Sequence, residues 1–192
     1  MILKLGELLD EDHLMDQKSL IKLFMLVIVV SGVFGFIYET LFYRIDLGYF
    51  VKRGTTFGPW IPIYGFGGLF ITLFTYRFRK NSWFVFFLSC IICGILEFMT
   101  GYLLFHMSGT RLWDYNTEIW NFGNVGGYIC FRSILFFGIS GVFLIYFIIP
   151  LCKKIIFYGS NSIFGLIGVY LGILFFLDVV ISDFIPVIFK YL

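Results

Sequence analysis

The sequence predicts an all-α polytopic membrane bundle of about five transmembrane helices, and three observations lead to this fold class. Sixty per cent of the 192 residues are apolar and 14% are charged, whereas soluble domains average about 25% charged residues. The mean hydropathy is +0.95. Five apolar stretches each approach the roughly 20 residues that a helix needs to cross hydrocarbon about 30 Å thick. These stretches lack the period-2 alternation of a membrane barrel, so we expect helices that contact the lipid bilayer.

The five expected spans are residues 20–43, 60–76, 83–105, 125–149 and 163–181. The second span is the shortest. Pro59 suits the first turn of a helix, while Pro62, Gly65 and Gly67 predict an irregular or partly unwound entry. Residues 1–19 are acidic and are expected to form a tail or a short amphipathic surface helix. Residues 20–192 then form a single transmembrane domain.

The distribution of Lys and Arg predicts the orientation. With five spans, the N-terminus and the connectors 77–82 and 150–162 share one side, which holds seven Lys or Arg near the spans against five on the other side. Because cytoplasmic loops are enriched in these residues, a cytoplasmic N-terminus is favoured. The long connectors 44–59 and 106–124 then lie together on the outer side, and this co-location holds in either orientation.

Several other features argue against nucleic acids, metals and cofactors. The net charge of +2 is small and no basic helix stands out, so nucleic acid is not an expected partner. Cys90 and Cys93 form a C-x-x-C in the middle of a span, where free Cys behaves as a small packing residue. In the last span, Gly165, Gly168 and Gly172 share a packing face. Asp178 and Asp183 near its outer end are expected to be exposed at the interface.

Two intramembrane carboxylates follow the same pattern of small residues. Ser31, Gly35 and Glu39 share one helical face in the first span, and Gly94, Glu97 and Gly101 share one in the third. Small residues let helices approach closely, and both faces end in Glu near the outer connectors. Burying a carboxylate in a span costs about 2.5–3.5 kcal/mol at the bilayer centre. Each Glu is therefore expected to point into the bundle and to meet a cation or a polar cavity. Arg44, Arg53 and Arg132 are the candidate cations.

The connector that follows the third span is rich in aromatic, amide and glycine residues. Trp113, Tyr115 and Trp120 are compatible with an interfacial aromatic belt, but Asp114 and Asn124 are not required for one. Gly-rich helix starts lie here and at Gly58, and a helix start offers free N–H groups to an anion or polar head group. Each half of the chain reads as a helix ending in Glu, a Gly/aromatic connector and a Gly-led helix, which hints at an internal duplication.

These motifs resemble those of a known bacterial integral-membrane family, "Putative ABC-transporter type IV", also called CmpB-like. The resemblance lies in "GFIYE", "KRGTTFGPWIPIYGFGG", "LEFMTG", "WDYN" and "GGYICF", which together span residues 33–150. The resemblance implies a bacterial plasma-membrane protein of transporter type. The residues that match the family pattern are Glu39, Arg53, Gly54, Gly58, Pro59, Pro62, Tyr64, Gly65, Glu97, Trp113, Asp114 and Tyr115. Lys52, Asn116 and Gly126 depart from it.

The favoured function is a small permease or permease component that handles a polar or charged solute in an outward-facing pocket. The expected substrate-binding residues are Glu39, Arg53, Gly58, Trp60, Tyr64, Glu97, Trp113, Asp114, Tyr115, Asn124 and Arg132. An ABC permease requires a separate ATPase subunit, because this sequence has no G-x-x-x-x-G-K-[ST] phosphate loop. A membrane binding or assembly protein without turnover is the alternative, and the same residues would then only hold the helices together. An envelope-lipid enzyme is less favoured, because the sequence shows no nucleophile–base pair and no metal-ligand set. Association into a homo-oligomer is left open.

Overall fold

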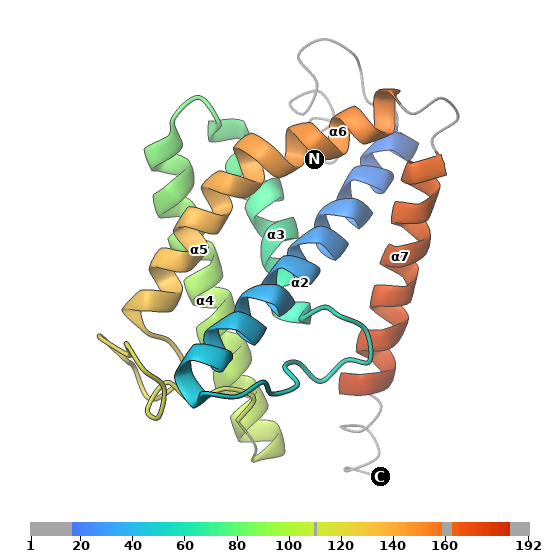
Figure 1. Ribbon diagram of the computed structural model, residues 1–192. Helices are drawn as coiled ribbons and strands as arrows, with labels where there is room; N and C mark the ends of the chain where they lie inside the picture. Colours follow the sequence, from blue (N-terminus) through green and yellow to red (C-terminus); the bar gives the residue numbers. More distant parts are fainter. Residues whose placement is uncertain (1–16, 110, 159–162, 185–192) are drawn as a thin grey trace.

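The computed structural model describes residues 17–109, 111–158 and 163–184 as a bundle of helices (Figure 1). Four helices are long and apolar enough to cross a membrane. Two of them are α2 (Gln17–Leu47) and α4 (Ser82–Ser108). The third is one continuous helix made of α5 (Phe131–Phe143), the π-helical segment η2 (Leu144–Ile148) and α6 (Ile149–Tyr158). The fourth is α7 (Ile163–Val179), which continues as the π-helical segment η4 (Val180–Phe184). The predicted all-α membrane bundle is confirmed. Residues 1–16 of the expected N-terminal tail lie outside the described residues, and residues 17–19 belong to α2.

The second predicted span differs from the others. Helix α3 (Pro62–Thr75) has only 14 residues, and at about 1.5 Å per residue it is too short to cross about 30 Å of hydrocarbon by itself. The expectation that Pro59 opens this helix is wrong, since Pro62 occupies the first turn and Ile61 before it is extended. The Ile61 N–H donates to the carbonyl of Gly32 in the middle of α2, 3.1 Å away. Non-helical backbone therefore enters the bundle here, where protein surrounds it.

The fourth predicted span is shifted along the sequence. Residues 125–129 close a tight turn through a Val125–Ile129 backbone pair, so α5 begins at Phe131 instead of Val125. The helix also continues through Pro150, where the sequence predicts an end. The π-helical segment lies immediately before this proline, and such a segment changes the backbone hydrogen-bond register where proline has no N–H to donate.

Small residues set the contact between α2 and α3, as predicted. A side chain added at Gly68 would collide with Ser31, and one added at Gly35 would collide with the Tyr64 ring. Helix α4 meets α5 in the same manner, with Gly141 against Ser89. Small residues at these points let the helix backbones approach closely.

The two helical hairpins are alike in contact as well as in sequence. Ser31 and Ser89 each stand eight residues before a glutamate, at Glu39 and Glu97, and each packs on a glycine of the following helix. The hairpins α2–α3 and α4–α5 therefore share one serine–glycine contact, and each carries its carboxylate at the same end of the bundle. The internal duplication itself stays a prediction.

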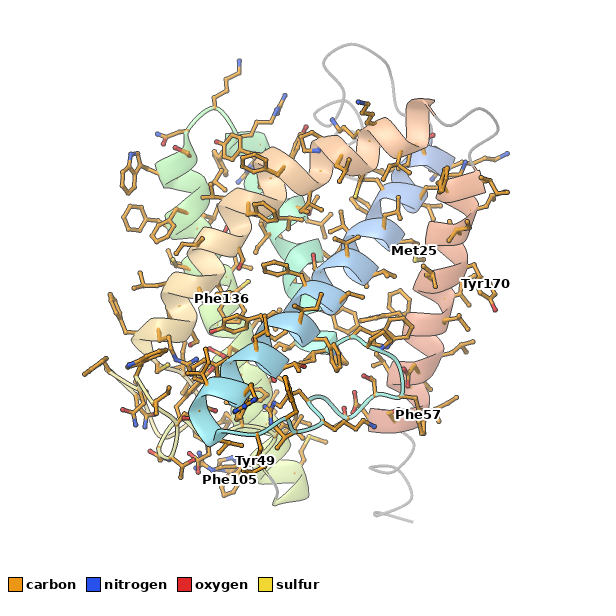
Figure 2. All side chains as sticks on the ribbon, in the orientation of Figure 1. Met25, Tyr49, Phe57, Phe105, Phe136 and Tyr170 are labelled. Atoms are coloured by element: carbon orange, nitrogen blue, oxygen red, sulfur yellow. The ribbon has the colours of Figure 1, made fainter. Side chains whose placement is uncertain are left out.

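Helix α7 packs on α2 through its glycine face, which confirms the packing role expected for that face. Gly168 lies against Leu26 and Gly172 against Met25, and Figure 2 shows Met25 between the two helices while Tyr170 points away from the bundle. Large apolar side chains cover the outside of the bundle. On α4, for example, Phe87, Ile91 and Ile95 are 58%, 57% and 60% exposed. A contiguous apolar face of this kind suits contact with lipid.

Candidate functional site

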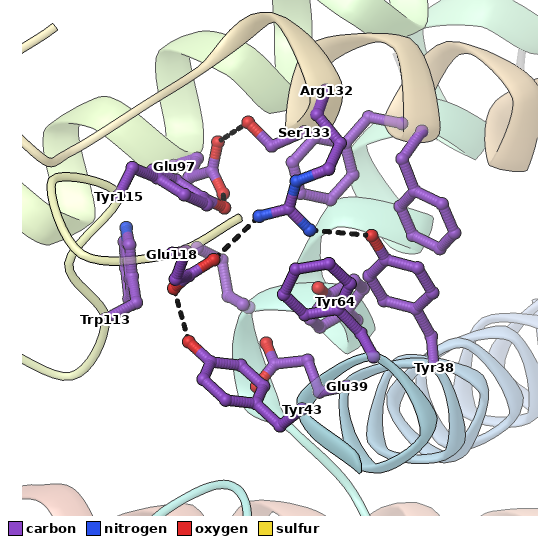
Figure 3. Close-up of a pocket in the computed structure, with 14 residues that line it drawn as sticks. Tyr38, Glu39, Tyr43, Tyr64, Glu97, Trp113, Tyr115, Glu118, Arg132 and Ser133 are labelled. Carbon is purple, nitrogen blue, oxygen red and sulfur yellow. Dashed lines mark hydrogen bonds and ion pairs between the residues drawn. The ribbon is translucent and has the colours of Figure 1, made fainter. Parts of the chain in front are cut away.

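The connectors 48–61 and 109–130 lie at the same end of the bundle, opposite the start of α2 (Figure 1). A cavity of about 20 Å³ lies between them and the helix ends (Figure 3). This volume is close to that of one water molecule. Its walls come from α2, α3, α4, the second connector and α5, through Tyr38, Glu39, Phe42, Tyr43, Ile63, Tyr64, Glu97, Trp113, Tyr115, Glu118, Arg132, Ser133, Phe136 and Phe137.

Glu39 pairs with Arg53 at this cavity. The Arg53 Nε donates to Glu39 Oε2 at 2.9 Å, and each side chain is only 17% exposed. The guanidinium of Arg53 also stacks on the Tyr43 ring, 3.7 Å from its centre. The backbone bends from Gly54 to Pro59 and leads back into the bundle at Ile61, so the first connector stays close enough to α2 for this pair to form. Arg44, another candidate cation, bonds instead to the carbonyl of Gly48 beyond its own helix.

A second ion pair joins Arg132 to Glu118, a residue that the sequence analysis did not select. Arg132 Nη2 lies 2.6 Å from Glu118 Oε2, and Glu118 is only 8% exposed although it belongs to a connector. The Tyr43 hydroxyl also donates to Glu118. The only available signal in the sequence was a carboxylate two residues before Trp120 in an aromatic loop.

Arg132 is the second residue of α5, which begins at Phe131. It therefore lies at the start of the helix and not two turns inside it, as the predicted span 125–149 implied. Its Nη1 donates to the Tyr38 hydroxyl at 3.3 Å, and its guanidinium lies 3.8 Å from the centre of the Phe42 ring. Within the described part of the chain, its buried Nε–H has no acceptor. The guanidinium is therefore held by contacts from α2 and the second connector together.

Glu97 differs from the other two carboxylates because both of its oxygens face hydroxyl groups. Tyr115 Oη donates to Oε1 at 2.6 Å, and Ser133 Oγ lies 2.8 Å from Oε2. Glu97 is 4% exposed, and none of the ion pairs between described residues includes it. Burial, and then the nearby Glu97 carboxyl, raise the pKa of Tyr115 well above its ordinary value. Tyr115 therefore stays a neutral donor.

Trp113 lines the cavity, but its neighbour Asp114 does not. Trp113 packs against Gly101 of α4 and donates its indole N–H to the Tyr128 carbonyl at 3.0 Å. Asp114 Oδ1 accepts from both the backbone N–H and the side-chain amide of Asn116. Asp114 therefore shapes the connector.

Asn124 also holds the connector together instead of lining the cavity. Its amide donates to Asn116 Oδ1, and its own Oδ1 accepts from the Gly127 N–H, both at 2.8 Å. Gly127 has a φ of +81°, and a side chain there would collide with Arg111 and Asp114. These contacts fold the connector so that Tyr115 and Glu118 turn toward the bundle.

Gly58 and Trp60 lie away from the cavity and bond to α7. The backbone N–H of Gly58 and the indole N–H of Trp60 both donate to Asp178 Oδ2, at 2.7 and 2.9 Å. The Phe57 N–H and the Ser182 hydroxyl donate to Asp178 Oδ1, each at 2.9 Å. The expectation that Gly58 presents free N–H groups at a helix start is therefore wrong.

The expectation that Asp178 and Asp183 are simply exposed at the interface is also wrong. Asp178 fixes the first connector through the four bonds just described, and Asp183 accepts from the Thr55 hydroxyl of the same connector. The reason is spatial, because the outer end of α7 lies beside the 54–60 segment. Asp178 accepts from backbone N–H groups that this non-helical segment leaves unpaired, and Asp183 accepts from its Thr55 hydroxyl.

A second cavity, of about 50 Å³, lies next to the first and shares Tyr64 and Phe137 with it. Its lining is mostly apolar, with Ser31, Cys93 and Ser140 as its few polar groups. The rings of Tyr64 and Phe137 stand 5.7 Å apart between centroids. No group of three or more His, Cys, Asp or Glu within the described ranges is arranged to hold a metal ion.

The family model described as "Putative ABC-transporter type IV" matches residues 26–183. The chain belongs to this family. As a member of this CmpB-like family, it is a multi-pass membrane protein related to ABC-transporter components. The match includes every residue of the cavity wall. No curated protein and no solved structure matches the chain.

Proposed function

We propose that this CmpB-like protein is a small permease, or the membrane component of one, and that a polar or charged solute passes through the cavity between its two hairpins. The observation that carries the proposal is the convergence of Glu39, Glu97, Glu118 and Arg132 at one cavity. Arg53 does not line the cavity but pairs with Glu39; we call these five residues the polar layer. They come from two helices of the bundle, from both connectors and from the start of α5.

The energetic argument favours a functional layer over simple packing. Each of two charges removed from water loses several kcal/mol of hydration free energy. Replacing a buried ion pair by apolar residues of similar volume therefore often leaves the stability of a protein unchanged or raises it. A fold that needed only helix contacts already has them in the Ser31–Gly68 and Ser89–Gly141 pairs. Ionisable residues inside membrane spans most often mark a path for ions or solutes.

The cavity is small in the form described here. With about 20 Å³ of space it is too small for an organic solute, and the Tyr64 and Phe137 rings stand between it and the second cavity. We infer that this form is an occluded state and that solute entry separates the two connectors. Passage onward requires the Tyr64 and Phe137 rings to move apart.

We further propose that the protein resides in the bacterial plasma membrane with its N-terminus in the cytoplasm. The end of the bundle opposite the polar layer supports this orientation, because the positions near its helix ends include Lys18, Lys22, Arg77, Lys153 and Lys154. The polar layer then faces outward. An ATPase, if it drives the movement, is a separate subunit that binds at the cytoplasmic end.

Native mass spectrometry of gently extracted protein tests the proposal directly. We expect the wild-type protein to retain a small polar solute, and we expect Glu39→Gln and Glu118→Gln to lose it while remaining folded. Asp114→Asn is the matched control, because it removes a carboxylate of the same end of the bundle that does not line the cavity. A co-purified ATPase subunit would identify the energy source.

The competing function is a membrane assembly protein without turnover. One observation favours it: Glu39 and Glu118 are each already paired with an arginine. In that case the wild-type protein retains no solute. Glu39→Gln and Glu118→Gln then lower only the amount of folded protein, and this result would rule out the permease.

A further inference from the structure

The hydrogen bonds around Ser133 determine which group near it carries a proton. Ser133 Oγ lies 2.8 Å from Glu97 Oε2 and 2.9 Å from the carbonyl oxygen of Cys130, and the Cys130 N–H donates to it at 3.3 Å. A serine hydroxyl has one hydrogen and two lone pairs. It can therefore donate to only one of the two oxygens beside it.

An ionised Glu97 does not satisfy this arrangement. If Ser133 donated to the carboxylate, the Cys130 carbonyl would keep the Ile134 N–H as a donor at 3.2 Å, but its oxygen and Ser133 Oγ would face each other at 2.9 Å with no hydrogen between them. If Ser133 donated to the carbonyl, lone pairs of Ser133 Oγ and Glu97 Oε2 would face each other at 2.8 Å. A neutral Glu97 resolves the conflict. Its Oε2–H donates to Ser133 Oγ, Ser133 donates to Cys130, and Oε1 accepts from Tyr115, so all three short contacts become hydrogen bonds.

The charges of the polar layer lead to the same assignment. Arg53 neutralises Glu39 and Arg132 neutralises Glu118. Glu97 is the third carboxyl of the layer, and it contacts two hydroxyl groups where the other carboxylates contact guanidinium groups. Three ionised carboxylates with two arginines would leave a net charge of −1 in a buried site, whereas a protonated Glu97 makes the layer neutral.

We propose that Glu97 is a proton-binding site: in this closed form its carboxyl holds a proton on Oε2, and opening of the layer lets that proton pass to water. Coupling of this release to solute movement rests on the function proposed above. The proton site itself depends only on the local geometry.

Titratable groups from α4 and from the elements packed around it lie near Glu97. From α4 itself, Cys93 lies one turn away, and from α3 the hydroxyl-bearing ring of Tyr64 lines the same cavity. Glu39 faces it from α2 and Glu118 from the second connector. Arg132, from α5, donates to Tyr38 and Glu118.

Infrared spectroscopy of the purified protein in an ester-free, carboxyl-free detergent provides the test. A protonated carboxyl has a C=O stretching band separate from the amide and carboxylate bands. We expect this band at neutral pH in the wild type and in Asp114→Asn, which removes a carboxyl outside the polar layer, and we expect Glu97→Gln to lose it. Glutamine keeps the shape of the side chain, donates to Ser133 and accepts from Tyr115, so Glu97→Gln is expected to fold.

A second variant keeps the test informative if Glu97→Gln does not fold. Ser133→Ala removes the acceptor of the Glu97 proton, so the band is expected to persist at a higher frequency. A wild-type spectrum without the band, a band unchanged in folded Glu97→Gln, or a band unmoved in Ser133→Ala would overturn the proposal. The infrared measurement needs no solute. If the band appears in protein without bound solute, the proton site is supported even when the permease function fails.

Discussion

The ion pair between Glu118 and Arg132 provides a direct test of whether the polar layer is truly buried. We consider Glu118→Leu, which removes the charge and preserves most of the side-chain volume. Arg132 would keep its contacts with Tyr38 and Phe42 but would lose its carboxylate, which lies 2.6 Å away. The two side chains are 16% and 5% exposed, so water screens the remaining charge poorly.

The expected cost follows from this burial. Removing one partner of a buried ion pair costs about 3–5 kcal/mol, because it leaves an uncompensated charge. For a chain of this size, each kcal/mol corresponds to a melting-temperature shift of about 2–4 °C, so the variant should melt roughly 6–20 °C below the wild type. The double variant Glu118→Leu/Arg132→Met removes both charges, and we expect it to recover all but about 1–3 kcal/mol, the cost of leaving the Tyr43 hydroxyl without its acceptor.

The cysteines of the protein supply the assay. Cys90, Cys93, Cys130 and Cys152 are all free and buried, so a maleimide dye that fluoresces on reaction with thiols reports unfolding during a thermal ramp in detergent. A Glu118→Leu protein that melts within about 2 °C of the wild type would refute the reasoning. A double variant less stable than the single variant would refute it equally, since the unpaired charge would then not be the source of the loss.

Three further predictions concern the connectors and the helix contacts. Asp178→Asn weakens the attachment of the first connector, so trypsin should cleave after Arg53 faster than in the wild type, as followed by gel electrophoresis. Gly68→Ala places a methyl group against Ser31 and should lower the free energy of unfolding by about 1–3 kcal/mol, as measured in the thiol-dye assay. Gly67→Ala places its methyl group 3.4 Å from the Cys93 sulfur and should lower it less. Equal losses of stability would contradict the packing argument. Because the pKa of Tyr115 is raised, its contribution to stability is present below its ordinary pKa of about 10 and is lost as the pH rises above it. The melting-temperature gap between wild type and Tyr115→Phe should accordingly be constant from about pH 7 to 9 and shrink above about pH 10.

Local sequence patterns were enough to predict the helices and several of their contacts. Hydrophobic runs located α2, α4 and α7, because a helix that spans lipid must be apolar along most of its length. The spacing of small residues before Glu39 predicted which face of α2 meets a neighbouring helix, since close approach requires small side chains. Glu97 was predicted to point inward because a carboxylate that faces lipid is costly.

The helix boundaries that were predicted wrongly depend on interactions that the local sequence pattern does not show. The start of α3 depends on the bond from the Ile61 N–H to Gly32 in α2. The helix continues past Pro150 because a π-helical segment precedes it. Neither the tertiary hydrogen bond nor the change of helical register can be recognised from the periodicity of one segment.

The amino-acid sequence by itself determined that this chain lies in a membrane and which ends of its helices carry acids. Composition and periodicity are properties of each segment, and lipid acts on each segment separately. Only the tertiary structure decided the partners: Glu39 with Arg53, Glu118 with Arg132, Glu97 with two hydroxyl groups, and Asp178 with the first connector. Such partners depend on distances between groups that are far apart in the chain, and those distances exist only once the hairpins have packed.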